Sequence, residues 1–339
     1  MTYKETLFFI AKCLTISLEE KNKEFVLLKL QSEEINWDLV VKISTNHYVL
    51  PALYCNLMRA AFLQYLPQDL VVYMDYITSL NRERNQQIIT QAKKLNTILL
   101  ANNITPLFLK GTGNLLAGLY EDIAERMVGD IDLIFSKENY SKTITVLKDN
   151  GYSETGNYKY HIPTQMHYRR ITKEKNIAAV EIHKNLIPKK YVGEFNYSYV
   201  QKDSQLINDF MVMSYENKLN LSITSYQIND IGYYYNTINL RNAYDVFLLS
   251  KKTNAKKSFS KFKTLRIPLN CFLAICYVTF GEINSLEYHK TEKTDNYLSV
   301  FNSLLLNERK RKSRIKLKYR KVFIKKRLSV IYKSIFDKE

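Results

Sequence analysis

Residues 107–135 constrain this chain more than any other stretch of it. An apolar run at 107–109 leads into Lys-Gly-Thr-Gly at 110–113, a short apolar helix follows, and a second apolar strand carries Asp130 and Asp132. Because side chains alternate across a strand, the two aspartates project from the same face. The stretch therefore predicts a strand, a glycine turn, a helix and a second strand with paired carboxylates.

The glycine turn followed by the paired aspartates indicates a chemistry that neither feature indicates alone. Two carboxylates about 7 Å apart along a strand repel each other unless a cation lies between them. Oxygen ligands suit Mg²⁺, which takes its remaining ligands from water and substrate phosphates. The glycines at 111 and 113 offer backbone N–H groups at a loop-to-helix junction, where anions bind. A phosphate site followed by a metal site predicts nucleotide chemistry, whereas an isolated DxD is usually a solvated strand end.

These residues resemble a known family. The LKG sequence at 109–111, the short helix ending at Tyr120, Arg126, and GDIDLIF at 129–135 are similar to the uncharacterised nucleotidyltransferase family of the polymerase-β-like superfamily. Where the superfamily has Gly-Gly or Gly-Ser, this chain has Gly-Thr. Threonine still supplies a hydroxyl but crowds the approach of the backbone to a phosphate.

The resemblance covers roughly residues 35–250 and is sharpest at 107–152. It implies an α+β fold, with a small mixed sheet of the nucleotidyltransferase type flanked by N- and C-terminal helical regions. It also implies a third carboxylate on a later strand.

Glu181 is the candidate for that third carboxylate. Two β-like runs at 166–172 and 177–183, joined by a polar connection, predict a hairpin. Glu181 lies in the otherwise apolar sequence AAVEIH, where an acid is costly without a cation. Taken alone it fits a satisfied edge-strand glutamate, but with the two aspartates upstream we expect a metal ligand. His183, on the same face, orients Glu181, contacts substrate or is purely structural.

The resemblance implies a Mg²⁺-dependent nucleotidyltransferase that moves an NMP from an NTP, such as ATP, to an acceptor and releases pyrophosphate. Asp130, Asp132 and Glu181 would be catalytic and would hold two Mg²⁺ ions. The residues expected to bind the nucleotide are Lys110, Gly111, Thr112, Gly113 and Arg126. Two of these have open alternatives: Lys110 contacts a phosphate or caps the strand, and Arg126 reaches the triphosphate, the carboxylates or a surface ion pair.

Helical patterns lie on both sides of this core. We expect a helical cap at 1–100, the catalytic core at 101–200, a C-terminal helical region at 201–305 and a basic amphipathic tail at 306–339. A single-face apolar stripe at 88–99 predicts a long helix in the cap.

Finer expectations follow from local spacing. We expect a strand at 104–109, helices at 114–120 and 138–150, and a return to helices from about 203, where Leu206, Phe210 and Met213 share a face. Arg241 and Asp245 are four apart on a predicted helix and predict an ion pair. The loop at 230–235 is a candidate for lining the cleft, where its tyrosines at 233–235 could stack on a base.

The formal net charge of +17 is concentrated in the tail. Residues 309–333 contain 13 Lys or Arg and no acid, so 17 minus 13 leaves only +4 for the remainder. Apolar residues recur at helical spacing within it, namely Leu317, Ile324, Leu328, Ile331 and Ile335. Through residues 309–335, such a helix binds an anionic membrane surface, grips nucleic acid, or docks on the body with a solvated basic face.

The cysteines Cys13, Cys55, Cys271 and Cys276 lie in apolar helical patterns without metal-like spacing. They predict buried free thiols in a reducing compartment. No run reaches the ~20 apolar residues that span a bilayer, and the N-terminus reads as an amphipathic helix rather than a signal peptide. We expect a cytoplasmic protein of bacterial type, peripheral at the inner membrane surface if the tail binds lipid.

Three functions remain compatible with the sequence. Transfer to a small molecule, glycan or lipid-linked intermediate is favoured. Transfer to RNA, as in toxin nucleotidyltransferases of the same superfamily, is disfavoured by the weakly charged body. A non-catalytic nucleotidyltransferase-like binding protein is disfavoured because it would have no need of three costly carboxylates.

Overall fold

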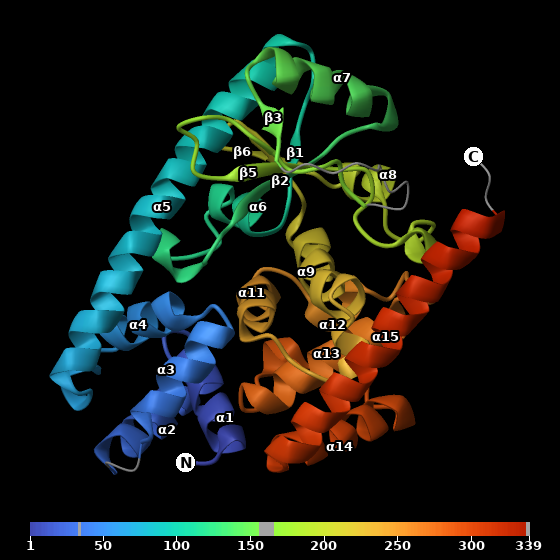
Figure 1. The fold of residues 1–339 in the computed structure, drawn as a ribbon. Coiled ribbons are helices and arrows are strands. Elements are labelled where there is room, and N and C mark those ends of the chain that lie inside the picture. Colours follow the sequence, from blue (N-terminus) through green and yellow to red (C-terminus); the bar gives the residue numbers. More distant parts are fainter. Residues whose placement is uncertain (33–34, 156–165, 337–339) are drawn as a thin grey trace.

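A computed structural model describes residues 1–32, 35–155 and 166–336. One mixed sheet with its own helices forms the upper half of the molecule, and helices from both ends of the chain form the lower half (Figure 1). The α+β fold with helical regions before and after a mixed sheet is confirmed.

The N-terminal helices precede the first strand of the sheet. They are α1 (Tyr3–Cys13), α2 (Glu20–Gln31), α3 (Trp37–Asn46), α4 (Leu50–Arg59), a 3-10 turn at Leu63–Tyr65, and α5 (Gln68–Ala101). At 34 residues, α5 is about 51 Å long, from the helical rise per residue. It runs beside both halves of the molecule (Figure 1). Its predicted stripe of Ile88, Ala92, Leu95 and Leu99 is fully buried.

The sheet has seven strands in the order β3-β4-β5-β2-β1-β7-β6. They are β1 (Leu107–Phe108), β2 (Asp130–Ile134), β3 (Ser153–Glu154), β4 (Ile171–Thr172), β5 (Ala179–His183), β6 (Gln205–Ile207) and β7 (Phe210–Val212). The central pair β2 and β5 is parallel, whereas β2 and β1 are antiparallel. The two strands predicted to carry the carboxylates are therefore direct neighbours.

Two local predictions were wrong. The helix after the first strand, α6 (Lys110–Leu116), begins at the lysine instead of at 114, so the glycine segment is its first turn. The segment after 203 begins with the β6–β7 hairpin, not a helix. Its Asn208 and Asp209 both have positive φ, of 48° and 66°, as a two-residue hairpin turn requires. The spacing of its apolar residues imitated a helical stripe.

The remaining helices are close to their predictions. Helix α7 (Lys137–Asp149) agrees with the predicted 138–150 and begins after the capping Ser136. One short element, η2 (Ile123–Glu125), precedes β2. Other short elements come after α7, at Lys189–Tyr191, α8 (Tyr197–Gln201) and Asn284–Leu286. The lower half contains α9 (Tyr215–Thr224), a π-helical turn (Ser225–Asn229), α10 (Gly232–Tyr235), α11 (Leu240–Ser250), α12 (Ala255–Ser258), α13 (Arg266–Thr279) and α14 (Glu292–Leu306).

The helices from the two chain ends pack on each other. Asn22 of α2 is buried and donates a hydrogen bond to the carbonyl of Phe280, 2.7 Å away. Helix α1 contacts both α13 and α14. The four cysteines are free and buried, as predicted.

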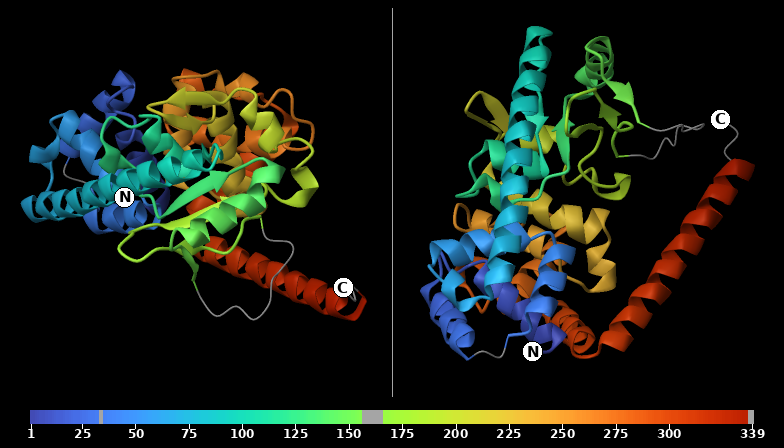
Figure 2. Two further views of the ribbon diagram at one scale, coloured as in Figure 1. Left: turned by 90° about the horizontal axis from the view of Figure 1, so that it is seen from above. Right: turned by 60° about the vertical axis from the view of Figure 1, so that its left-hand side comes forward.

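The basic tail is one helix, α15 (Glu308–Phe336). Its first turns touch the body, where the Arg311 guanidinium lies 3.4 Å from the ring centroid of Tyr3. It then projects away from the rest of the molecule (Figure 2). The large apolar side chains exposed on it are Leu317, Tyr319, Phe323, Ile324 and Leu328. The predicted stripe residues Ile331 and Ile335 have side chains outside the described part of the chain.

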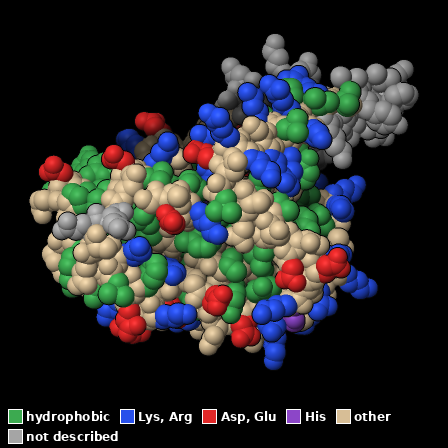
Figure 3. Space-filling model, turned by 90° about the horizontal axis from the view of Figure 1, so that it is seen from below, with side chains coloured by type: hydrophobic (Ala, Val, Ile, Leu, Met, Phe, Trp, Pro, Cys, Tyr) green, Lys and Arg blue, Asp and Glu red, His purple; other side chains and the backbone are tan. Residues whose placement is uncertain are grey.

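Lys and Arg side chains gather on this helix with hydrophobic side chains between them, whereas acidic and basic groups are mixed on the rest of that face (Figure 3). Within the described ranges of the chain, no helix combines the length and the apolar character that a bilayer crossing demands.

Candidate active site

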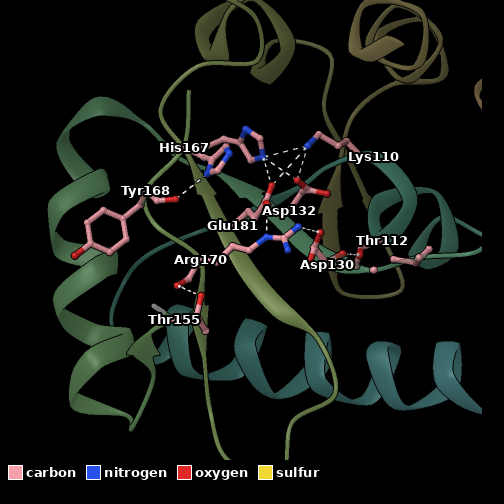
Figure 4. A network of polar contacts seen from close by, with 12 residues as sticks. Lys110, Thr112, Asp130, Asp132, Thr155, His167, Tyr168, Arg170 and Glu181 are labelled. Atoms are coloured by element: carbon pink, nitrogen blue, oxygen red, sulfur yellow. Dashed lines mark hydrogen bonds and ion pairs between the residues drawn. The ribbon is translucent and has the colours of Figure 1, made fainter. Parts of the chain in front are cut away.

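Three carboxylates meet where β2 and β5 run side by side. In the parallel register Asp132 lies opposite Glu181, and Asp130 lies opposite Ala179. Residues paired in register, and those two apart on one strand, share a face of the sheet. The side chains of Asp130, Asp132 and Glu181 accordingly point into one polar cluster (Figure 4). The structure thus brings together the three residues predicted to be catalytic, although their catalytic role stays a prediction.

Polar side chains of α5 hold the loop that precedes β2. The amide nitrogen of Asn81 donates to the carbonyl of Ala124 at 2.6 Å, and that of Asn85 donates to the carbonyl of Arg126 at 2.7 Å. Both asparagines are buried. These side chains supply hydrogen bonds that the backbone of the loop does not make for itself.

The same helix also holds β5. Gln91, which is buried, forms two hydrogen bonds with the backbone of Ala178: its amide donates to the carbonyl at 2.8 Å, and its oxygen accepts from the N–H at 3.1 Å. The segments that precede both carboxylate-bearing strands are therefore anchored to α5.

Lys110 lies among the carboxylates. Its ammonium donates to Asp132 Oδ1 at 2.6 Å and lies 3.9 Å from Glu181 Oε2. The residue has a φ of +50°, a conformation that costs a non-glycine residue roughly 1–2 kcal/mol. The side chain pairs with the acidic cluster instead of capping the strand, and its contact with a phosphate stays a prediction.

His183 completes the inner part of the cluster. Its Nε2 lies 2.7 Å from Asp132 Oδ1 and 3.7 Å from Glu181 Oε2. One ligand atom from each of Asp132, Glu181 and His183 lies within 4.8 Å of the others, and all three residues are buried. Carboxylate oxygens with an imidazole nitrogen are a donor set that fits a divalent metal.

Arg170, which the sequence did not single out, bridges two of the carboxylates. Its Nε donates to Glu181 Oε1 at 2.7 Å and its Nη2 donates to Asp130 Oδ2. The side chain is 51% exposed, so it covers the cluster from the solvent side. Its place one residue before β4 depends on the pairing of β4 with β5, which local spacing does not determine.

The cations keep two of the carboxylates ionised. Burial alone would raise the pKa of Asp132, but Lys110 and a hydrogen bond from His183 lower it below its ordinary value. Burial would likewise raise the pKa of Glu181, and hydrogen bonds from His183 and Arg170 lower it instead. The pKa of Asp130 is raised, by burial and then by repulsion from Glu181.

The glycine segment serves packing as much as binding. The buried Thr112 hydroxyl donates to the backbone carbonyl of Asp130 at 2.8 Å, so its proton is engaged with β2. A Cβ on Gly113 would lie 2.6 Å from the carbonyl oxygen of Phe108. The N–H of Gly113 donates to the carbonyl of Leu109 at 2.9 Å. Of the segment, Lys110 and Gly111 line the cavity beside the carboxylates.

Arg126 is buried and paired with Asp245. Its Nε donates to both carboxylate oxygens of Asp245, at 3.0 and 3.1 Å, and its Nη1 donates to the Met127 carbonyl. The Tyr120 hydroxyl donates to the same carboxylate at 2.8 Å. The predicted ion pair of Asp245 with Arg241 is not among those formed by the described residues. Arg126, instead of lying on the surface, joins the sheet half to α11.

A cavity of about 360 Å³ lies between the carboxylates and the lower helices. The lower wall is polar, and the residues forming it are Leu221, Ser222, Ser225, Asn229, Asp230, Arg241, Asn242 and Asp245. Of the predicted loop at 230–235, Asp230 lines this cavity, whereas the tyrosines at 233–235 are not among its lining residues. Tyr233 instead stacks on Tyr297, with ring centroids 5.2 Å apart.

Two solved structures from Helicobacter pylori are similar to this chain. The crystal structure of JHP933 from Helicobacter pylori is 14% identical to this chain, with a TM-score of 0.31, and the match covers 70% of this chain and 97% of that one. A candidate nucleotidyltransferase from H. pylori is 17% identical, with a TM-score of 0.31 and coverage of 70% and 96%. No curated protein matches the chain.

A family described as uncharacterised nucleotidyltransferase matches residues 33–280, which is most of the chain and includes all of the cluster described above. The protein therefore belongs to this uncharacterised nucleotidyltransferase family.

Proposed function

We propose that this protein is a Mg²⁺-dependent nucleotidyltransferase that transfers an NMP from an NTP to an acceptor hydroxyl and releases pyrophosphate. The observation that carries the proposal is the meeting of Asp130, Asp132 and Glu181 from two adjacent strands beside a cavity of about 360 Å³. Membership of the family supports the reaction class. The division into cap, core, C-terminal helices and tail remains part of the proposal.

The donor set supports a hard divalent cation. Asp130, Asp132 and Glu181 together offer carboxylate oxygens, which Mg²⁺ prefers. Such an ion, when bound, would neutralise charge on the transferring phosphate and on the leaving group. The chain's own residues then need to supply positioning and further positive charge, which are the main requirements of phosphoryl-type transfer.

In the proposed reaction the acceptor oxygen attacks the α-phosphorus of the NTP. A new P–O bond forms, the bond from the α-phosphorus to the oxygen of the β-phosphate breaks, pyrophosphate leaves, and the hydroxyl proton is released. Glu181 fits the role of ligand and orienting group better than that of base, because hydrogen bonds from His183 and Arg170 hold its pKa low despite burial. Gly111 and Arg126, which line the cavity, remain the proposed phosphate contacts.

Labelling with α-³²P-NTPs tests this proposal. The full chain, with Mg²⁺ and a cell extract, should transfer label to an acceptor, and Asp132→Asn should reduce the transfer at least 100-fold, on the order of the loss of one preorganised charge-stabilising group. Asp149→Asn, an exposed aspartate at the end of α7, is the matched control and should leave labelling unchanged. Absence of labelling with every NTP would favour a non-catalytic binding protein.

The fraction that carries the label identifies the acceptor. We favour a small molecule, glycan or lipid-linked intermediate, with the protein cytoplasmic and the tail resting on the inner membrane surface. The exposed apolar side chains between the basic residues of α15 support this choice. An amphipathic basic helix binds an anionic membrane by burying its apolar side chains and by the attraction of its basic side chains to lipid headgroups. Label entering RNA would instead favour the toxin-like alternative.

Vesicle flotation tests the tail separately. The full chain should float with phosphatidylglycerol vesicles and not with phosphatidylcholine vesicles, and a chain lacking 309–339 should float with neither. Equal flotation of both chains would remove the membrane role of the tail. Binding of the tail to RNA but not to vesicles would assign it to nucleic acid.

A further inference from the structure

Two cations of the chain itself already lie among the three carboxylates, and they occupy different positions. Lys110 comes from the first turn of α6 and reaches the cluster from within the fold. Arg170 comes from the edge side of the sheet and covers the cluster from solvent. Figure 4 shows the two side chains approaching the carboxylates from different directions.

The inner position belongs to Lys110. Asp132 Oδ1 receives both the ammonium of Lys110, at 2.6 Å, and Nε2 of His183, at 2.7 Å. The same two groups lie 3.9 and 3.7 Å from Glu181 Oε2. One oxygen of Asp132 and one oxygen of Glu181 therefore face the ammonium of Lys110 and the buried imidazole of His183.

The outer position belongs to Arg170. This guanidinium contacts the other oxygen of Glu181, Oε1, and Oδ2 of Asp130. It shares no oxygen with Lys110. The side chain of Arg170 is 51% exposed, against 29% for Lys110, so solvent screens the ion pairs of Arg170 more than those of Lys110.

The backbone supports the difference between the two positions. Lys110 keeps a left-handed conformation, with φ at +50°, and such strain in a non-glycine residue persists where the surroundings over-determine it. The conformation starts α6 one residue before Gly111, whose absent Cβ would approach Val128 Cγ2 to 2.9 Å. The lysine is thereby fixed at the end of a buried strand and is not free to retreat along a flexible loop.

We propose that Lys110 permanently fills the inner cation position and that the site accepts a single divalent ion, in the outer position now covered by Arg170. This inference rests on the proposed function and departs from the two-ion arrangement that the family resemblance implies. Asp130, Asp132 and Glu181 hold the ion through the oxygens that Lys110 does not use, and Arg170 moves aside. Before substrate binds, one divalent ion and one ammonium balance three carboxylates, whereas two ions and the ammonium leave an excess of positive charge.

Binding of Mn²⁺ to the full chain, followed by electron paramagnetic resonance, counts the ions without relying on activity. The wild-type protein should bind one Mn²⁺ per chain and give the spectrum of an isolated ion. Lys110→Met should bind two, and the pair should show spin coupling because ions in two-metal sites lie about 3.5–4 Å apart. Lys110→Arg, which retains the charge, should bind one. Circular dichroism of each variant verifies that it is folded.

Arg170→Met is the matched variant for the outer position. It should still bind one Mn²⁺, with an affinity about 2- to 5-fold higher because a weak competing ion pair has been removed. Loss of Mn²⁺ binding in this variant would overturn the assignment of Arg170 as a displaceable cover.

Two further results would overturn the inference while leaving the proposed function intact: two coupled ions in the wild-type protein, or a single ion in folded Lys110→Met. Failure of the wild-type protein to bind any Mn²⁺, together with absence of labelling, would overturn the proposed function as well.

Discussion

Replacing Asp245 with asparagine should destabilise the protein more than any other single charge removal discussed above. The carboxylate is only 2% exposed and the Arg126 side chain only 8%. Asp245 accepts from Arg126 Nε at 3.0 and 3.1 Å and from the Tyr120 hydroxyl at 2.8 Å. Asparagine retains one acceptor oxygen but removes the charge that compensates a buried guanidinium. Removing one partner of a buried ion pair costs about 3–5 kcal/mol.

Urea unfolding followed by tryptophan fluorescence and circular dichroism measures this cost. The double variant Arg126→Met/Asp245→Leu should regain most of the lost stability, because a buried pair replaced by apolar groups of similar volume is often neutral. The same double variant should bind NTP more weakly than wild type if Arg126 contacts phosphate. Glu308→Gln, which breaks the exposed pair with Lys312, is the control and should produce no measurable change.

A loss of less than about 1 kcal/mol in Asp245→Asn, the magnitude of an exposed pair, would refute the reasoning. It would mean that Arg126 is solvated or that another acidic group compensates it. Failure of the double variant to recover stability would show that the hydrogen bond from Tyr120, rather than the charge pair, carries the effect.

Three further predictions concern the glycine segment and the sheet edge. Thr112→Val should cost about 1 kcal/mol, because it removes one hydrogen bond to a partly buried carbonyl of β2, while NTP affinity by calorimetry stays unchanged. Weakened NTP binding would instead indicate that the hydroxyl contacts a phosphate. Gly113→Ala should lower the free energy of unfolding by about 1–3 kcal/mol, because the new Cβ clashes with the backbone of β1. Gly129→Ala is the control and should leave the free energy of unfolding nearly unchanged in the same urea titration, because a Cβ there has no neighbour within 4 Å. A hydrogen bond from the Tyr168 hydroxyl, ahead of other contacts, lowers the pKa of Glu154 from 4.5 to about 2. The stability this gives is present above pH 4.5 and is lost as the pH falls toward 2, so Glu154→Gln should be less stable than wild type at neutral pH and equal to it near pH 2.

Two of the three carboxylates were accessible from short-range rules, because Asp130 and Asp132 share a face through strand alternation. Glu181 needed more than its neighbours, because taken alone it fits an edge-strand glutamate. The two aspartates upstream and the family resemblance together indicated its place in the cluster. The parallel pairing of β2 with β5 then places Glu181 opposite Asp132.

The contacts of the basic side chains could not be predicted from neighbouring residues. Arg170 reaches it through the β4–β5 pairing, and Arg126 meets Asp245 across 119 residues of chain. Lys110 was read as part of a glycine turn because left-handed residues are usually glycine or asparagine. Its left-handed conformation starts the helix one turn earlier than predicted and directs the side chain toward Asp132. No local sequence pattern predicts this conformation.

Helix α5 has a consequence for how the acidic residues keep their mutual alignment. Asn85 holds the segment before β2 and Gln91 holds the residue before β5, about 9 Å apart along one helix from its rise per residue. The helix therefore fixes the relative position of two strands that are distant in sequence. One residue inserted between Asn85 and Gln91 would rotate one of these two side chains away from its hydrogen-bond partner by about 100°. Tolerance to insertions in this protein should accordingly be lowest in a helix that contributes no residue to the cavity.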